Sequence, residues 1–133
     1  PYFSLDLFGF HYSDNKNEIE IDTESLHVVN EAMWRVIYDK NIGTASHIKK
    51  IDSLEFAGKT GTAQVYNLDK GKTGKKSLQD HALFISFAPF ESPEIVVSVI
   101  VDNGGCGSAV AAPIARDIIN FYFENIKSKV AMQ

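Results

Sequence analysis

Apolar side chains recur every three or four residues between residues 23 and 39, which predicts an amphipathic helix. The expected buried stripe consists of Leu26, Val29, Met33, Val36 and Ile37. Asp22 or Thr23 can cap the first turn, since short polar side chains accept hydrogen bonds from the free N–H groups there. Asn41 and Gly43 follow the last apolar residue and are residue types that end helices.

A second helix is expected over residues 109–127, because its apolar positions show the same period. The stripe predicted to face the core is Ile114, Ile118, Ile119, Tyr122 and Ile126. Pro113 belongs in a first helical turn, where its missing N–H costs nothing, so the start of this helix is set only to within a few residues.

Three strands are predicted between the two helices, over residues 54–66, 81–88 and 95–101. Leu83, Ile85 and Phe87 alternate along the second strand and share one face. The third strand is almost continuously apolar, which is typical of a central strand that is covered on both faces. Residues 67–80, which include the lysine-rich segment Lys70–Lys76, are rich in glycine and lysine. This composition predicts a solvated loop.

The first 22 residues give a weaker pattern. Residues 1–10 are aromatic-rich and loosely alternating, residues 13–17 form a polar turn, and Ile19 and Ile21 alternate with acidic residues as in a short strand. No repeat or linker divides the chain, so residues 1–133 are expected to form one unit. The predicted class is α+β, with an antiparallel sheet of three strands packed against an N-terminal and a C-terminal helix.

Composition narrows the possible functions. Hydrophobic residues make up 44% of the chain and charged residues 23%, which is typical of a folded domain. The net charge of −4 gives no electrostatic basis for binding nucleic acid. No apolar run approaches the roughly 18 residues that span a bilayer. Cys106 has no partner for an internal disulfide, and no pair among His11, His27, His47 and His81 has metal-ligand spacing, so neither a metal nor a cofactor is expected.

Residues 57–64 form an unusual strand. Gly58 and Gly61 weaken it and indicate close approach by a ligand or another backbone. Lys59 adds a positive charge, and Thr60 and Thr62 add hydroxyl donors, so the strand edge can hold an anion or pair with an extended peptide. A phosphate-binding P-loop would need a glycine five positions before each Gly-Lys pair, and Ser53 and Tyr66 stand there instead.

The remaining match is the Lys-Thr-Gly element of penicillin-binding proteins and serine β-lactamases. Over roughly residues 26–123 the chain resembles class B penicillin-binding proteins, most closely the elongation type called penicillin-binding protein 2. The segments that carry the resemblance are Gly58-Lys59-Thr60-Gly61-Thr62-Ala63-Gln64, Gly43-Thr44-Ala45, His81-Ala82-Leu83-Phe84, Phe87-Ala88-Pro89, Asp102-Asn103-Gly104-Gly105 and Ala111-Ala112-Pro113-Ile114-Ala115-Arg116.

The resemblance implies part of a serine β-lactamase/transpeptidase-like fold that cross-links peptidoglycan stem peptides through an acyl-enzyme and is trapped by β-lactams. Lys59 would polarise the site and attract the substrate carboxylate, and Thr60 and Thr62 would bond that carboxylate. The backbone N–H of Thr62 would be one of two oxyanion-hole donors, and Gly61 would let the substrate lie against the strand. The parent protein would lie at the periplasmic face of the inner membrane, held by an upstream anchor.

The family also needs a Ser-x-x-Lys at the start of a buried helix and a Ser-x-Asn nearby. Ser13-Asp14-Asn15-Lys16 and Ser46-His47-Ile48-Lys49 fit the first pattern, but neither is expected to begin a buried helix. We therefore expect no nucleophile in this chain and an inactive fragment on its own, whose partner is the upstream part of the domain. Residues 95–101 would then present an open sheet edge. The alternatives are a non-catalytic interaction module and a β-lactamase or D,D-carboxypeptidase relative.

Overall fold

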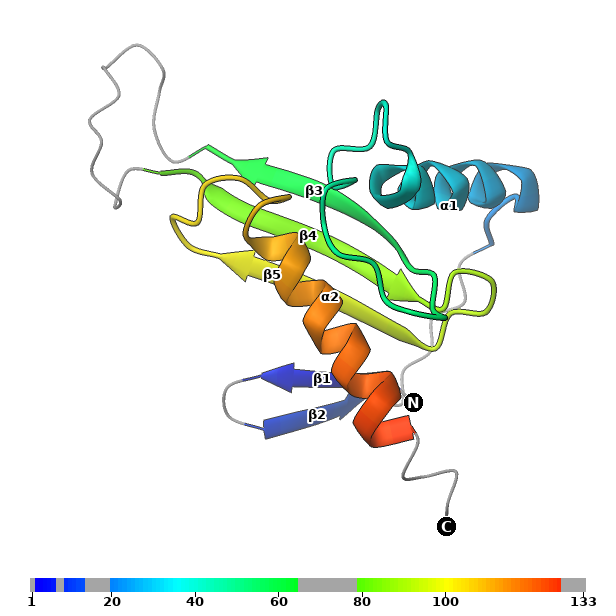
Figure 1. Cartoon of the computed structure of the whole chain (residues 1–133). Coiled ribbons are helices and arrows are strands. Elements are labelled where there is room, and N and C mark those ends of the chain that lie inside the picture. The colour runs from blue at the N-terminus through cyan, green and yellow to red at the C-terminus, as the bar shows by residue number, and fades with distance from the viewer. Residues whose placement is uncertain (1, 7–8, 14–19, 65–78, 128–133) are drawn as a thin grey trace.

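The described part of the computed structural model comprises residues 2–6, 9–13, 20–64 and 79–127. Its centre is a three-stranded antiparallel sheet of β3 (Ala57–Ala63), β4 (His81–Ala88) and β5 (Ile95–Val101), in the order β3-β4-β5. The helices α1 (Thr23–Tyr38) and α2 (Ala111–Phe121) pack against it (Figure 1). The predicted α+β class is confirmed.

The three strands lie close to their predicted positions. β4 and β5 have the bounds that the sequence predicts, whereas β3 begins three residues later than expected. The expectation that β5 is covered on both faces is wrong for this chain, because Val96 and Ile100 are 64% and 65% exposed while Val97 and Val99 are buried. The expected open edge is confirmed, since β5 pairs only with β4 in the described sheet.

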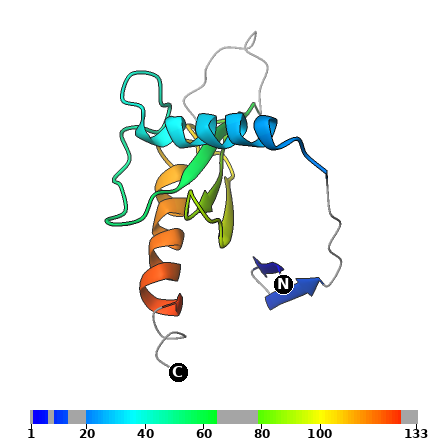
Figure 2. The same cartoon turned by 90° about the vertical axis from the view of Figure 1, so that its right-hand side faces the viewer.

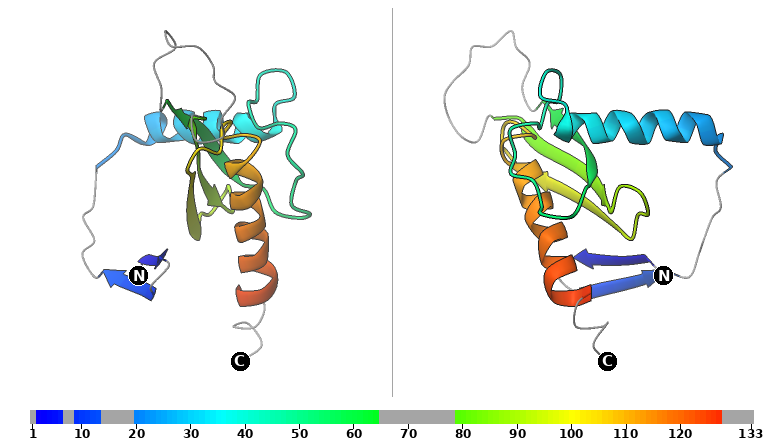
Figure 3. Two further views of the ribbon diagram at one scale, coloured as in Figure 1. Left: turned by 90° about the vertical axis from the view of Figure 1, so that its left-hand side faces the viewer. Right: turned by 45° about the vertical axis from the view of Figure 1, so that its right-hand side comes forward.

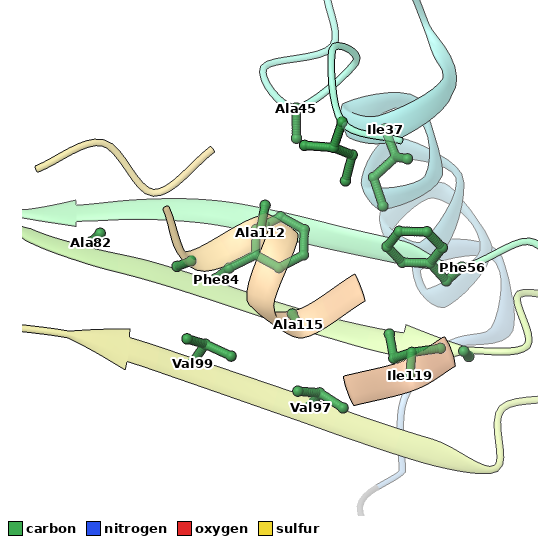
Figure 4. Packing of buried hydrophobic residues seen from close by; sticks show 13 residues of the cluster. Ile37, Ala45, Phe56, Ala82, Phe84, Val97, Val99, Ala112, Ala115 and Ile119 are labelled. Carbon is green, nitrogen blue, oxygen red and sulfur yellow. The ribbon is translucent and has the colours of Figure 1, made fainter. Parts of the chain in front are cut away.

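One face of the sheet meets α2, and their contact forms most of the core (Figure 4). The helix contributes Ala111, Ala112, Ala115 and Ile119, all fully buried, over Phe84 and the two buried valines of β5. The predicted stripe is therefore wrong in its phase: Ile119 faces the core, but Ile114 and Ile118 are 40% and 44% exposed. Alanines face the sheet because their small side chains let the helix backbone approach it closely. Beyond α2 the chain continues as a π-helix, η2 (Tyr122–Lys127).

α1 forms as predicted, but only its C-terminal half is packed. Asp22 caps it, its side chain accepting the N–H of Ser25 at 2.8 Å. Ile37 is fully buried, whereas Leu26 and Val29 of the predicted stripe are 43% and 54% exposed. Figure 2 shows the reason: the helix crosses the β3 side of the sheet, and its N-terminal half projects beyond it.

The N-terminal residues form a hairpin that the sequence pattern did not predict. β1 (Tyr2–Asp6) pairs antiparallel with β2 (Gly9–Ser13), and Figure 3 shows the hairpin apart from the sheet. Of the strand expected over residues 18–22, residues 20–22 are not in a strand and the others lie outside the described residues. Most of the predicted 67–80 loop lies outside them too. Within the described ranges, no helix is both long and apolar enough to cross a bilayer.

Candidate active site on the edge strand

β3 lies at one edge of the three-stranded sheet, so the backbone N–H and C=O groups of its residues point alternately toward β4 and away from it. The contact of β3 with Gly107 shows which residues point which way. A side chain at Gly107 would lie 2.5 Å from the carbonyl oxygen of Gly61 and 2.4 Å from that of Leu83. These oxygens are therefore at most about 5 Å apart, which in an antiparallel ladder marks a hydrogen-bonded pair. The N–H and C=O groups of the neighbouring Thr60 and Thr62 consequently point away from β4, to the open edge.

The side chain of Lys59 reaches this open edge. Its ammonium donates to the carbonyl of Thr60 at 2.7 Å and lies 3.5 Å from the Thr60 hydroxyl. An ammonium carries three donor hydrogens, so this geometry leaves donor capacity for a bound anion. Lys59 and Thr62 are exposed, and Thr60 is half-buried. The predicted donors are thus brought together on one strand edge.

The two glycines of the motif have different roles. A side chain at Gly58 would collide with the Phe84 ring at 2.4 Å, so this glycine makes room for a core aromatic and not for a ligand. At Gly61 a side chain would meet Leu83 at 3.1 Å, a tight contact on the sheet face opposite α2. The backbone that approaches Gly61 closely is that of Gly107. The prediction of close approach is therefore correct at Gly61 for a backbone, and at Gly58 the neighbour is a side chain.

Thr44 also belongs to the site. Its hydroxyl lies 3.1 Å from that of Thr60. The flanking N–H groups of Gly43 and Ala45 donate to Asp39 and Val36 at 2.9 Å, which fixes this segment on the C-terminal end of α1. The sequence marked Gly43-Thr44-Ala45 as a matching segment but gave it no role.

The loop between β5 and α2 braces the far end of β3 and β4. The N–H of Asn103 donates to Nδ1 of His81 at 3.0 Å, and the N–H of Gly105 donates to the Asp80 carbonyl at 2.8 Å. The carbonyl of Gly107 accepts the N–H of Ala112 at 2.9 Å. Gly107 therefore contacts both the start of α2 and the backbone of Gly61. The three glycines of this loop, Gly104, Gly105 and Gly107, were the sequence signal for this close packing.

A model of the penicillin-binding protein transpeptidase domain matches residues 11–120. The chain belongs to this family. Haemophilus influenzae peptidoglycan D,D-transpeptidase MrdA is 42% identical over 95 residues, which cover 68% of this chain and 14% of the relative. The chain therefore spans about one seventh of that protein's length.

Solved structures of the family have the same fold. Pseudomonas aeruginosa PBP2 in complex with WCK 5153 superposes with a TM-score of 0.67 at 30% identity, covering 88% of this chain and 24% of that one. The imipenem acyl-enzyme of penicillin-binding protein A from M. tuberculosis gives a TM-score of 0.55, also at 30% identity, over 78% of this chain and 20% of that chain.

The serines of the two Ser-x-x-Lys segments, Ser13 and Ser46, are both described, and neither lies at the start of a helix. Ser13 is the last residue of β2, and the other residues of the predicted polar turn, 14–17, lie outside the described residues. Ser46 lies in the turn after α1, where its N–H donates to the Gly43 carbonyl at 3.1 Å. Both positions differ from the helix start that a family nucleophile requires.

The remaining candidate side chains have local roles. Glu31 forms a salt bridge with Arg35 at 2.5 Å on α1. Cys106 is exposed, and a hydrogen bond with the Ser108 hydroxyl at 3.2 Å holds the pKa of its thiol below the ordinary value. Among the described residues no group of three or more His, Cys, Asp or Glu side chains could hold a metal ion.

Proposed function

We propose that this chain is the C-terminal portion of a peptidoglycan D,D-transpeptidase domain and contributes the Lys-Thr-Gly wall of its active site. The observation that carries the proposal is the open edge of β3, where Lys59, Thr60 and Thr62 combine an ammonium, hydroxyls and backbone groups that point away from β4. An extended peptide that ends in a carboxylate matches such an edge, because its backbone can pair with the strand while the carboxylate meets the positive charge.

The substrate would be the stem peptide of peptidoglycan, with Lys59 and Thr60 holding its terminal carboxylate. The N–H of Thr62, which points away from β4, would stabilise the oxyanion that forms when a serine attacks the penultimate residue's carbonyl. One such donor typically contributes about 10²–10³ in rate. β-Lactams would acylate the same serine, as the acyl-enzyme of the M. tuberculosis relative supports.

The serine itself would come from a part of the domain outside this chain, since Ser13 and Ser46 lack the required setting. Exposed apolar surfaces support such a partner. Ile85, Val96 and Ile100 are 47–65% exposed on the sheet face away from α2, and Leu26 and Val29 are exposed on α1. The occupant would be the rest of the transpeptidase domain, and the parent protein would act at the periplasmic face of the inner membrane.

A chimera tests the proposal. This chain would replace the matching segment of Haemophilus influenzae MrdA, and intact-protein mass would be followed during incubation with penicillin. We expect one penicillin adduct on the chimera, and an acylation rate about 10²-fold lower in Lys59→Ala. Lys49→Ala is the matched control, because Lys49 is also exposed but lies in the α1–β3 connection.

The isolated chain provides the second arm. It should gain no mass with penicillin, and neither should Ser13→Ala. A stoichiometric adduct on the isolated chain that disappears in Ser13→Ala would show that the chain holds its own nucleophile. A chimera acylated equally fast with and without Lys59 would show that this strand edge is not part of the site.

A further inference from the structure

The Thr60 hydroxyl, at the strand edge, meets two other donor groups among the described residues. Its oxygen lies 3.1 Å from the Thr44 hydroxyl and 3.5 Å from the Lys59 ammonium. An ammonium can only donate, so Thr60 accepts from Lys59 with one lone pair. A hydroxyl has one proton, and the direction of the Thr44–Thr60 hydrogen bond therefore decides which hydroxyl is free to donate to a ligand.

When Thr44 donates to Thr60, the Thr60 proton is released toward the open edge, beside the ammonium. An anion at that edge selects this direction, because it needs donors. We infer that Thr44 is a positioning residue for carboxylate binding, which orients the Thr60 hydroxyl so that it donates to the carboxylate held by Lys59. The inference rests on the proposed function for the identity of the anion. The contact through which Thr44 orients Thr60 does not depend on that function.

The backbone around Thr44 is built to hold this hydroxyl in place. A side chain at Gly43 would lie 2.4–2.7 Å from the carbonyl oxygens of Arg35, Val36 and the C-cap Asp39, so only glycine lets the segment dock on this end of α1. Ala45 is fully buried, and its N–H donates to the Val36 carbonyl. Thr44 thus stands between two anchored residues. Threonine is also restricted at its first side-chain torsion, which limits the positions of its hydroxyl.

The first test measures the side-chain rotamer of Thr60 by NMR couplings in the ligand-free 133-residue chain. We expect one dominant rotamer in the wild type, rotamer averaging in Thr44→Val, and a return to one rotamer in Thr44→Ser. Valine keeps the shape and removes the hydroxyl, whereas serine keeps the hydroxyl. A single unchanged Thr60 rotamer in Thr44→Val would overturn the inference, whatever the chain binds.

The second test titrates the same variants with acetyl-D-alanyl-D-alanine and with its C-terminal amide, following the backbone signals of residues 59–62. Thr44→Val should weaken binding of the acid about five- to ten-fold, as expected for a weakened hydrogen bond to a charged group, and leave the amide unchanged. Thr44→Ser should bind the acid like the wild type. Equal weakening of acid and amide would refute the carboxylate role of Thr44.

These outcomes separate the two proposals. A wild-type chain that does not prefer the acid over the amide would contradict the proposed carboxylate site itself. The rotamer measurement would still decide whether Thr44 orients Thr60. Conversely, a clear preference for the acid that Thr44→Val does not change would leave the proposed function standing and remove Thr44 from it.

Discussion

Gly107 packs against the backbone of β3, and replacing it with alanine should displace that strand. The new methyl carbon would start 2.4 Å from the Leu83 carbonyl oxygen and 2.5 Å from that of Gly61. Ordinary carbon–oxygen contacts are about 3.3 Å, so the loop and β3 must separate by almost 1 Å. Overpacking of this kind typically costs about 1–3 kcal/mol. We expect the upper part of that range, because both clashing groups are backbone atoms in a hydrogen-bonded ladder.

Urea denaturation of the chain measures the free energy of unfolding, and amide hydrogen exchange at Gly61 and Leu83 reports the ladder. Gly105→Ala is the matched control, because it lies in the same loop with its nearest non-local atom 3.8 Å away. Because the φ of Gly105 is 79°, alanine there should lower the free energy of unfolding by about 1–2 kcal/mol, while its methyl group makes no contact with β3. If Gly107→Ala unfolds no more easily than Gly105→Ala and Gly61 exchange is unchanged, Gly107 does not support the strand.

Three further predictions concern the core, a helix cap and the thiol. Phe84→Ala should lower the free energy of unfolding by about 3–5 kcal/mol, because Phe84 is 1% exposed, whereas Ile85→Ala, at a 47% exposed position, should cost far less in the same urea titration. The hydrogen bond at the start of α1 lowers the pKa of Asp22, so its stabilisation is present above the ordinary value of 3.8 and is lost as pH falls through the lowered pKa. Circular dichroism against pH should show this loss of helix stability. Asp22→Asn keeps a hydrogen-bond acceptor but does not titrate, so in this variant the pH-dependent loss should disappear. Ser108→Ala should raise the pKa of Cys106, so its alkylation by iodoacetamide should begin at higher pH than in the wild type; identical pH profiles would contradict the assigned hydrogen bond.

The local patterns predicted most of the fold. Periodicity located α1, β4 and β5 to within a residue, because the alternation of polar and apolar side chains follows the geometry of each element directly. It also located the second helix, but it gave the wrong face of α2, where the larger isoleucines suggested a stripe that is partly exposed. The N-terminal hairpin was missed because its aromatic residues show no clear period.

The sequence by itself determined the chemistry of the strand edge, since Lys59, Thr60 and Thr62 supply the charge and the hydroxyls wherever the strand lies. It also determined the family, through several short segments spaced along the chain. These are local properties of residue type and order.

Only the tertiary structure decided which groups meet. Thr44 and Thr60 are sixteen residues apart, and their hydroxyls come within 3.1 Å because the end of α1 docks beside β3. Gly107 reaches Gly61 only because α2 folds back over the sheet. Such contacts depend on how whole elements pack, and packing is set by the shapes of many side chains together, which no local pattern of residues records.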